Sequence, residues 1–501
     1  MYAAITSATL VGTHGTPIVV EAHVGAGIPG FTVVGLPDEG CRESRDRVRA
    51  AMLSSGMEWP NRRITINLAG AGERKGGAGM DLAIAVGLLV AQGIISAEST
   101  DTIAFIAELG LDGSLRPTTG VAPLVASVAD HQVVVAWPSV GEASLARPPR
   151  LRAVATLAEL VSILRGESAW PEVDVAVPKV TDDPIADLSD VRGQETARFA
   201  LEVAAAGFHH LLMIGPPGAG KSMLARRLPG LLPRLTDDQA FDCAMARSAA
   251  GLRVAPSVVS SPPFRAPHHS ISLVGMVGGG SGIIRPGEMT LASHGVLFLD
   301  EMGEFAPSVL EALRQPLEER VVHISRAHSS VTLPARCLLV AATNPCPCGG
   351  GEPGSCECPP SSIRKYQRRF SGPLLDRFDL RVRLARPSTD DLTGSMAGES
   401  TSAVAERVAR AREFSIARQG CANSDIPAEI LDDVAPVTSD AMSWLRGQLE
   451  RGRLSGRGYH RVRRVARTIA DLKGHVGPVD IECIEVAMFM RAAFTPTRES
   501  F

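Results

Sequence analysis

Short apolar runs alternate along the chain with stretches of helical spacing, and this alternation predicts a mixed α/β protein. The runs at 211–214, 296–299 and 337–344 have the character of strands that are buried on both faces, as in a parallel sheet. Residues 64–68 alternate between apolar and polar side chains, which is typical of a half-buried strand. Residues 81–91 form a strongly apolar segment that predicts a buried helix.

Changes in this pattern divide the chain into four segments, and its 501 residues leave room for two or three domains. Residues 1–166 have both strand and helix patterns. Three prolines, several acidic residues and the lack of a sustained period make 167–187 a candidate linker. The strongly apolar strand candidates fall within 188–390, whereas 391–501 contains helical stretches and little strand character.

The composition favours a globular protein of the cytoplasm. A net charge of −3 argues against wholesale adhesion to nucleic acid, although local basic patches are compatible with it. We see no signal peptide, and no apolar run approaches the roughly 20 residues of a membrane helix. Nine cysteines, an odd number, do not suggest a disulfide framework. We therefore expect a cytoplasmic location and no membrane partner.

An octapeptide of the form G-x-x-x-x-G-K-S carries the clearest chemistry. It lies between the strand candidate 211–214 and a helix-forming run, where backbone N–H groups and a helix N-terminus can surround a phosphate. Lys221 can then reach the β- and γ-phosphates, and the Ser222 hydroxyl can hold Mg²⁺. The octapeptide consists of Gly215, Pro216, Pro217, Gly218, Ala219, Gly220, Lys221 and Ser222.

Polar residues follow two further strand candidates. Asp300 and Glu301 come directly after 296–299, and Asn344 ends 337–344. A carboxylate at a strand end can hold Mg²⁺, the next can orient the attacking water, and an asparagine can hydrogen-bond that water. The sequence therefore predicts a protein that binds a nucleoside triphosphate with Mg²⁺ and hydrolyses it.

Arginines in two parts of the chain extend this prediction. A guanidinium that meets the γ-phosphate accelerates hydrolysis and often comes from a neighbouring subunit. Arg377 is a candidate at the far edge of the core. Arg457, Arg461 and Arg464 recur at helical spacing, so they can share one face that is either simply solvated or in contact with nucleotide.

These motifs together resemble the AAA+ ATPases, in the branch of magnesium chelatase and the replicative helicases of the MCM type. The closer resemblance is to the ComM/YifB family of magnesium-chelatase-like ATPases. Besides the phosphate loop, the resemblance rests on Gly193-Gln194, Arg265 to His269, Gly278 to Ser281, Pro286 to Glu288, Leu297 to Glu301, Thr343 to Gly349 and Ala466 to Leu472.

The resemblance implies an AAA+ core with a parallel sheet and a C-terminal helical lid. It implies that Arg377 is an arginine finger acting on a neighbouring subunit, Asn344 the first sensor, and Arg457 the second sensor, with Arg461 as the alternative. It further implies a homo-oligomeric ring, most often a hexamer. The activity it implies is ATP-driven work on DNA, as a helicase or in branch migration during recombination of incoming DNA.

Residues 321–334 read as two short strands around a polar turn. In the branch that the chain resembles, such a hairpin points into the pore of the ring. Arg326 and His328 lie near its tip, where cationic side chains could follow a phosphate backbone. The alternative is an ordinary exposed hairpin.

Four cysteines form two C-x-C pairs: Cys346, Cys348, Cys356 and Cys358. The glycine-rich segment between the pairs can fold back, so that four thiolates converge on a tetrahedral Zn²⁺. Zinc ribbons usually use C-x-x-C pairs, and disulfides are the rival interpretation, which the expected compartment disfavours.

The N-terminal segment resembles the proteolytic domain of Lon, an α+β fold, through Gly110 to Pro117 and the turn and helix at Lys75 to Leu89. Lon-type cleavage needs a serine and a lysine. Ala78 stands where the serine is expected, and 120–124 contains no lysine. We therefore expect no peptidase activity.

The function then has two readings. The first is a ring that couples ATP hydrolysis to movement on single-stranded or branched DNA. The alternative is a chelatase-like or chaperone-like ATPase that remodels a protein partner. The nucleotide site supports both equally, whereas the hairpin tip, the basic run from Arg451 to Arg467 and the family resemblance favour DNA.

Overall fold

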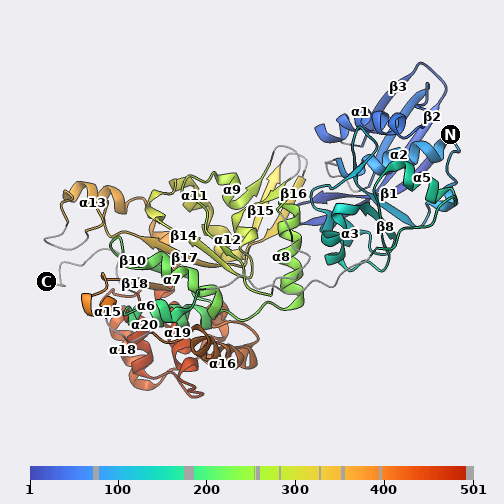
Figure 1. Ribbon diagram of the computed structural model, residues 1–501. Helices are drawn as coiled ribbons and strands as arrows, with labels where there is room; N and C mark the ends of the chain where they lie inside the picture. The colour runs from blue at the N-terminus through green and yellow to red at the C-terminus, as the bar shows by residue number, and fades with distance from the viewer. Residues whose placement is uncertain are drawn as a thin grey trace.

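A computed structural model describes residues 1–35, 37–70, 78–173, 186–252, 254, 260–280, 284–326, 329–350, 356–393 and 398–491. Two β-sheets, each with its own helices, follow one another along the chain, and a group of helices follows the second sheet (Figure 1). In the view of Figure 1 the first sheet lies at the upper right, the second at the centre, and the last helices below it.

The first sheet has seven strands of mixed direction. Its order is β3 (Gly30–Val34), β4 (Arg63–Ala69), β2 (His14–Gly25), β1 (Tyr2–Val11), β5 (Ile103–Ile106), β8 (Gln132–Ala136) and β9 (Leu151–Val154). The helices of this part are α1 (Glu39–Ser54), α2 (Asp81–Ala91), α3 (Val121–Ser127), α4 (Val140–Ala143) and α5 (Leu157–Leu164). α2 is buried almost throughout, which explains its uniformly apolar sequence.

The second sheet has five parallel strands. Their order is β11 (Phe264–Arg265), β14 (Val296–Leu299), β17 (Leu338–Thr343), β10 (Leu211–Ile214) and β18 (Leu380–Arg383). Every residue of β10, β14 and β17 is buried. Successive residues point to opposite faces, so Leu211 and Met213 join one apolar core while Leu212 and Ile214 join another. Continuous apolar runs are required because both faces are covered.

Helices and a hairpin cover the two faces of this sheet. On one side lie α6 (Glu195–Gly207), α16 (Thr401–Gln419) and α19 (Gly456–Leu472). On the other side lie α9 (Leu273–Val277), α10 (Glu288–Leu291), α11 (Pro307–Ala312), α12 (Arg314–Glu319) and the hairpin of β15 (Val321–Arg326) and β16 (Ser329–Pro334). The other helices are α7 (Lys221–Arg227), α8 (Asp237–Ala249), α13 (Pro360–Gln367), α14 (Gly372–Leu375), α15 (Thr389–Thr393), α17 (Leu431–Val434), α18 (Ser439–Glu450) and α20 (Ile481–Phe489).

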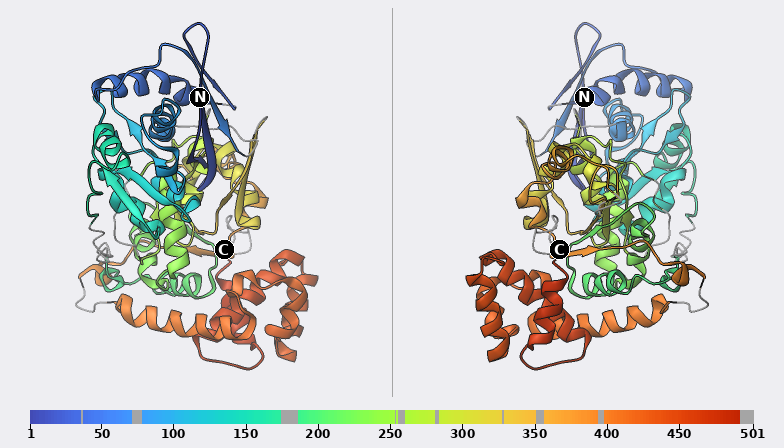
Figure 2. Two further views of the ribbon diagram at one scale, coloured as in Figure 1. Left: turned by 90° about the vertical axis from the view of Figure 1, so that its right-hand side faces the viewer. Right: turned by 90° about the vertical axis from the view of Figure 1, so that its left-hand side faces the viewer.

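The two sheet-containing parts contact each other through α3 and α8, and through β1 and the hairpin (Figures 1 and 2). The backbone N–H of Ala122 donates to Ser248 Oγ at 3.3 Å, and Ser248 Oγ donates to Glu142 Oε1 at 2.5 Å. The turn after β1 places Gly12 directly against the side chains of Val331 and Leu333 in β16. The hairpin is therefore packed against the first part at its base.

The structure confirms the predicted strands at 211–214 and 296–299 and the helix at 81–91, and it contains the predicted hairpin over 321–334. The helix after the phosphate loop begins at Lys221, because Gly220 adopts a left-handed conformation and caps it. Among the helices that the structure describes, none combines the length and apolar character needed to cross a membrane.

Candidate nucleotide-binding site

The phosphate loop connects β10 to α7 as predicted. Gly218 and Gly220 have φ angles of +80° and +85°, which side chains with a Cβ rarely adopt, so the loop curls tightly and α7 begins at its end. The N–H of Gly215 donates to the carbonyl of Thr343 at 3.1 Å. The side chain of Gln194 donates to the carbonyls of Ala219 and Ala385. Both ends of the loop are thus fixed to neighbouring segments.

Lys221 points back into the mouth of the loop. Its Nζ donates to the carbonyl oxygens of Gly215 and Pro216 at 2.5 and 2.9 Å, and to Asn344 Oδ1 at 3.1 Å. Burial lowers the pKa of Lys221, while the carboxylates of Asp300 and Glu301 act in the opposite direction. A cation held among oxygen atoms in a curled loop can bind the terminal phosphates of a nucleotide.

Ser222 and Asp300 form the oxygen pair suited to Mg²⁺. Ser222 Oγ donates to Asp300 Oδ2 at 2.7 Å, although the two residues are 78 positions apart in sequence. Mg²⁺ prefers hard oxygen ligands and is usually bound by one or two protein groups together with phosphates and water. The donor set therefore fits the ion that the sequence predicted.

Glu301 stands next to Asp300 with a backbone that is unusual for a residue other than glycine. Its φ and ψ are 50° and 48°, and its side chain is 62% exposed, so the carboxylate faces the open side of the site. His269 lies beside it, with Nδ1 3.9 Å from Glu301 Oε2. The His269 ring also contacts that of His268 in a tilted arrangement, with centroids 4.1 Å apart.

The parallel sheet brings these residues together because the carboxyl ends of its strands meet at one edge. A cavity of about 420 Å³ opens there. It is lined by Pro217, Gly218, Ala219, Gly220, Lys221, Ser222, Met223, Asp300, Glu301, Ala342, Thr343 and Asn344. The residues proposed for phosphate, metal and water therefore surround one space.

Arg377 lies at the opposite end of the same sheet. It precedes β18, whose first residue Leu380 pairs with Leu211 at the start of β10, whereas the phosphate loop follows the end of β10. Its side chain is 10% exposed, and Nη2 donates to Glu318 Oε2 at 2.5 Å. Burial lowers the pKa of Arg377, with a contribution from Arg457 among its neighbours.

Arg457 is exposed near the start of α19. Arg461, the alternative second sensor, donates to Asp379 Oδ1 at 2.8 Å and is committed to that ion pair. Arg457 lies about one helical turn before Arg461 on α19 and acts electrostatically on Arg377.

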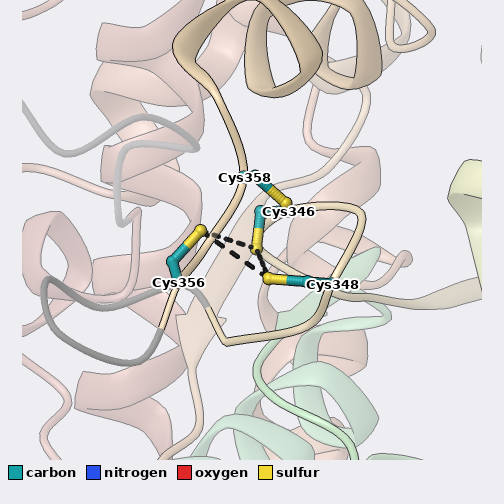
Figure 3. A group of neighbouring side chains, drawn as sticks. All are labelled: Cys346, Cys348, Cys356 and Cys358. Atoms are coloured by element: carbon teal, nitrogen blue, oxygen red, sulfur yellow. Dashed lines mark hydrogen bonds between the residues drawn. The ribbon is translucent and has the colours of Figure 1, made fainter.

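The four cysteines of the two C-x-C pairs converge after Asn344 (Figure 3). Their sulfur atoms all lie within 4.8 Å of one another, and three of the separations are 3.3, 3.5 and 3.7 Å. Four sulfurs about 2.3 Å from a tetrahedral zinc would be about 3.8 Å apart. The N–H of Gly350 and neighbouring thiols lower the pKa of Cys348 to about 6, which favours the ligating thiolate.

The cysteine loop also contacts the phosphate loop. Gly349 has a φ of +80°, and a Cβ at this position would lie 2.6 Å from Cδ of Pro217. Only a residue without a side chain allows the two loops to approach so closely.

The DNA contacts predicted for Arg326 and His328 at the hairpin stay a prediction. The backbone of Arg326 ends β15, but its side chain and the whole of His328 lie outside the described residues.

Comparison with known proteins identifies the family. Three family models match the chain: "Magnesium chelatase, subunit ChlI" over 187–392, "Subunit ChlI of Mg-chelatase" over 20–137, and "Magnesium chelatase, subunit ChlI C-terminal" over 398–491. The competence protein ComM of Haemophilus influenzae is 40% identical over 480 residues, 94% of each chain. The chain belongs to the ComM/YifB family of magnesium-chelatase-like AAA+ ATPases.

The chain is also similar to two further proteins. The uncharacterised protein YifB of Escherichia coli is 41% identical over 467 residues, 92% of each chain. A shorter match, 26% identical over 171 residues, covers 34% of this chain and 19% of an uncharacterised MCM-type protein of Methanocaldococcus jannaschii.

Sequence reasoning missed three residues at these sites: Gln194 as a link between loops, His269 beside Glu301, and Glu318 beside Arg377. The first two lie within motifs on which the resemblance rests, so the motifs marked their segments without giving their contacts. No local signal marks Glu318, which is 59 positions from Arg377.

Proposed function

We propose that this ComM/YifB family member is an ATP-hydrolysing motor that assembles as a ring, most often of six subunits, and works on single-stranded or branched DNA in the cytoplasm. The observation that carries the proposal is the placement of charge at the two ends of one sheet. Lys221, Ser222, Asp300, Glu301 and Asn344 surround one cavity at the carboxyl end, while Arg377 lies at the amino end.

The chemistry follows from these positions. Lys221 binds the oxygens of the β- and γ-phosphates as the positive charge of the loop. Ser222 and Asp300 would hold Mg²⁺, which neutralises charge on the phosphates. Glu301 orients the attacking water, and Asn344 hydrogen-bonds near the γ-phosphate.

The position of Arg377 favours a ring. Its strand, β18, runs parallel to β10, so the finger and the phosphate loop lie at opposite ends of that pair of strands. A guanidinium placed there can serve only the nucleotide of another subunit. Because Arg457 acts electrostatically on Arg377, we propose that this second-sensor candidate also serves the nucleotide of another subunit.

Family membership and the hairpin favour DNA as the substrate. One full-length relative is named a competence protein, and a partial match is an MCM-type protein. We propose that Arg326 and His328, at the turn between β15 and β16, contact the phosphate backbone.

The chain is divided, in this proposal, into an N-terminal Lon-protease-like domain (1–166), a linker (167–187), the AAA+ core (188–390) and a helical lid (391–501). The family matches at 20–137, 187–392 and 398–491 support these boundaries. The N-terminal domain acts as a platform without peptidase activity, packed on α8 and on the base of the hairpin.

The cysteines Cys346, Cys348, Cys356 and Cys358 hold a structural Zn²⁺ in this proposal. The separations of their sulfur atoms and the contact between Gly349 and Pro217 support it. Four thiolates would fill a tetrahedral Zn²⁺, leaving no open position for catalysis, and the site would brace the phosphate loop through the contact of Gly349 with Pro217.

Steady-state ATP hydrolysis tests the main proposal. The rate is measured without polymer, with single-stranded DNA, with a four-way DNA junction and with an unfolded protein, at one fixed salt concentration. We expect DNA to raise the rate, and Arg326→Ala to remove that increase while sparing the polymer-free rate. Stimulation by the unfolded protein alone would instead favour the remodelling of a protein partner.

The role of Glu301 is tested in the same assay. Glu301→Gln should retain ATP binding and lower kcat by about 100-fold or more, because the water loses its orienting carboxylate. Glu304→Gln is the matched control, since Glu304 is an exposed acid of the same segment that contacts Arg369. Hydrolysis by Glu301→Gln at the wild-type rate would contradict the assignment.

A further inference from the structure

The finger candidate Arg377 is held by its own subunit. Nη2 donates to Glu318 Oε2 at 2.5 Å, and the arginine side chain is 10% exposed against 62% for the glutamate. Its Nε is buried and has no hydrogen-bond partner among the residues that the structure describes. A guanidinium that is covered and neutralised in this way cannot meet a phosphate of another subunit without moving outward.

The charges around this ion pair oppose the arginine. Arg457, Arg461 and Arg314 all lie close enough to act on Arg377 electrostatically. Arg461 is paired with Asp379, and Arg314 with Glu311 at 2.6 Å. Because like charges repel, Glu318 supplies the attraction that keeps Arg377 in place.

Glu318 is also connected to the hairpin. It stands in the last turn of α12, and the chain passes through Arg320 directly into β15. Arg320 has a φ of +62°, forms an ion pair with Asp425 and lies over the ring of Phe208. The short segment that carries Glu318 is thus continuous in sequence with the first strand of the hairpin.

We propose that Glu318 is a positioning residue for Arg377: it keeps the finger on its own subunit and releases it when the hairpin is displaced by a bound polymer. This inference rests on the proposed ATPase function and adds to it the step that links polymer binding to hydrolysis in the neighbouring subunit. Removal of the carboxylate leaves Arg377 among like charges and frees it to move outward.

The test compares Glu318→Ala and Glu318→Gln with wild-type protein, with and without single-stranded DNA. We expect Glu318→Ala to raise the polymer-free kcat about fivefold or more, the lower range of coupling between sites. Stimulation by DNA should shrink by a similar factor, and the KM for ATP should not change because the phosphate loop is untouched. Glu318→Gln keeps the shape and a hydrogen-bond acceptor. Its polymer-free kcat should therefore lie between those of wild-type protein and Glu318→Ala.

Two controls make the result specific. Glu319→Gln changes the next residue of α12, which contacts Gln315 and His323. This variant should leave the ratio of the hydrolysis rates with and without single-stranded DNA unchanged. Glu318→Ala combined with Arg377→Ala should behave like Arg377→Ala alone, because the effect acts through the finger. Melting curves of each variant show that the fold is retained.

The outcomes separate this inference from the proposed function. If wild-type protein hydrolyses ATP and Glu318→Ala leaves the polymer-free rate unchanged or lowers it, the inference is overturned while the ATPase remains. If neither wild-type protein nor any variant hydrolyses ATP, the proposed function is overturned and the inference with it.

Discussion

The two ends of the five-stranded sheet use charged residues in opposite ways. At the carboxyl end, Lys221, Asp300 and Glu301 border an open cavity. At the amino end, Asp379 accepts from Arg461 at 2.8 Å and lies 3.4 Å from Nδ1 of the fully buried His209. The first arrangement leaves charges available to a ligand, whereas the second uses charges to attach α19 to the sheet.

The difference shows how one parallel sheet can serve two sites. The carboxyl end is open to a ligand, whereas the amino end carries Arg377 in an ion pair with Glu318, beside the ion pair of Asp379 and Arg461. The buried pairs fix where the two arginines stand, because α19 carries Arg457 and the segment before β18 carries both Arg377 and Asp379.

The largest expected effect separates the two ends directly. Arg377→Ala should lower kcat by about 10³-fold and leave ATP affinity unchanged, because an arginine finger acts on the transition state. The measurement is ATP hydrolysis beside nucleotide titration, with the exposed Arg368→Ala as the control. Mixing with Lys221→Ala subunits should restore hydrolysis. Failure to recover in mixed rings shown to form would contradict action between subunits.

Substitution at the carboxyl end should change the affinity for ATP. Lys221→Ala should weaken ATP binding about 100-fold, because the phosphates lose a charge-assisted contact. Titration with a fluorescent ATP analogue measures this, and Lys365→Ala, an exposed lysine of α13, is the control. Equal affinities of the two variants would remove Lys221 from the phosphate site.

The sequence predicted the strands that are apolar throughout and missed those with interrupted apolar runs. The runs at 211–214 and 296–299 match β10 and β14 residue for residue, because strands covered on both faces must be continuously apolar. β1 was not predicted: its alanines, serine and threonines weaken the apolar signal. β18 was also missed, because arginines interrupt its apolar positions.

The grouping of the candidate phosphate-site residues could be predicted because they follow strands that are recognisable in the sequence. The amino-end cluster joins residues that are far apart in sequence: His209 and Thr468, which hydrogen-bond at 2.8 Å, are 259 positions apart. Their contact depends on how α19 packs on the sheet, and no spacing in the chain encodes it. The same holds for Glu318 and Arg377.

Loss of one cysteine of the cluster should have an intermediate effect, on metal content and on thermal stability. Purified protein should carry about one zinc per chain, and Cys356→Ser should lower both the metal content and the melting temperature. Cys421→Ser, outside the cluster, is the matched control. Elemental analysis and melting curves measure the two quantities. Full zinc content in Cys356→Ser would show that this thiol is not a ligand.

A separate expected effect concerns stability at the amino end. Burial alone would raise the pKa of Asp379, but the hydrogen bond with His209 and the charge of Arg461 outweigh it and hold this pKa well below its usual range. The folded state therefore gains stability from the ionised carboxylate above pH about 4, the ordinary value for Asp, and loses this gain as the pH falls below it.

Asp379→Asn should consequently lower the free energy of unfolding at pH 7 by about 3 kcal/mol, the cost of breaking a buried ion pair. The gap from wild-type protein should narrow as the pH falls toward about 3. Asp376→Asn, a half-exposed acid of the same segment, is the control and should show a much smaller gap. Urea unfolding at both pH values measures it. A gap that does not change with pH would mean that Asp379 acts through shape and hydrogen bonding, and that charge does not attach α19 to the sheet.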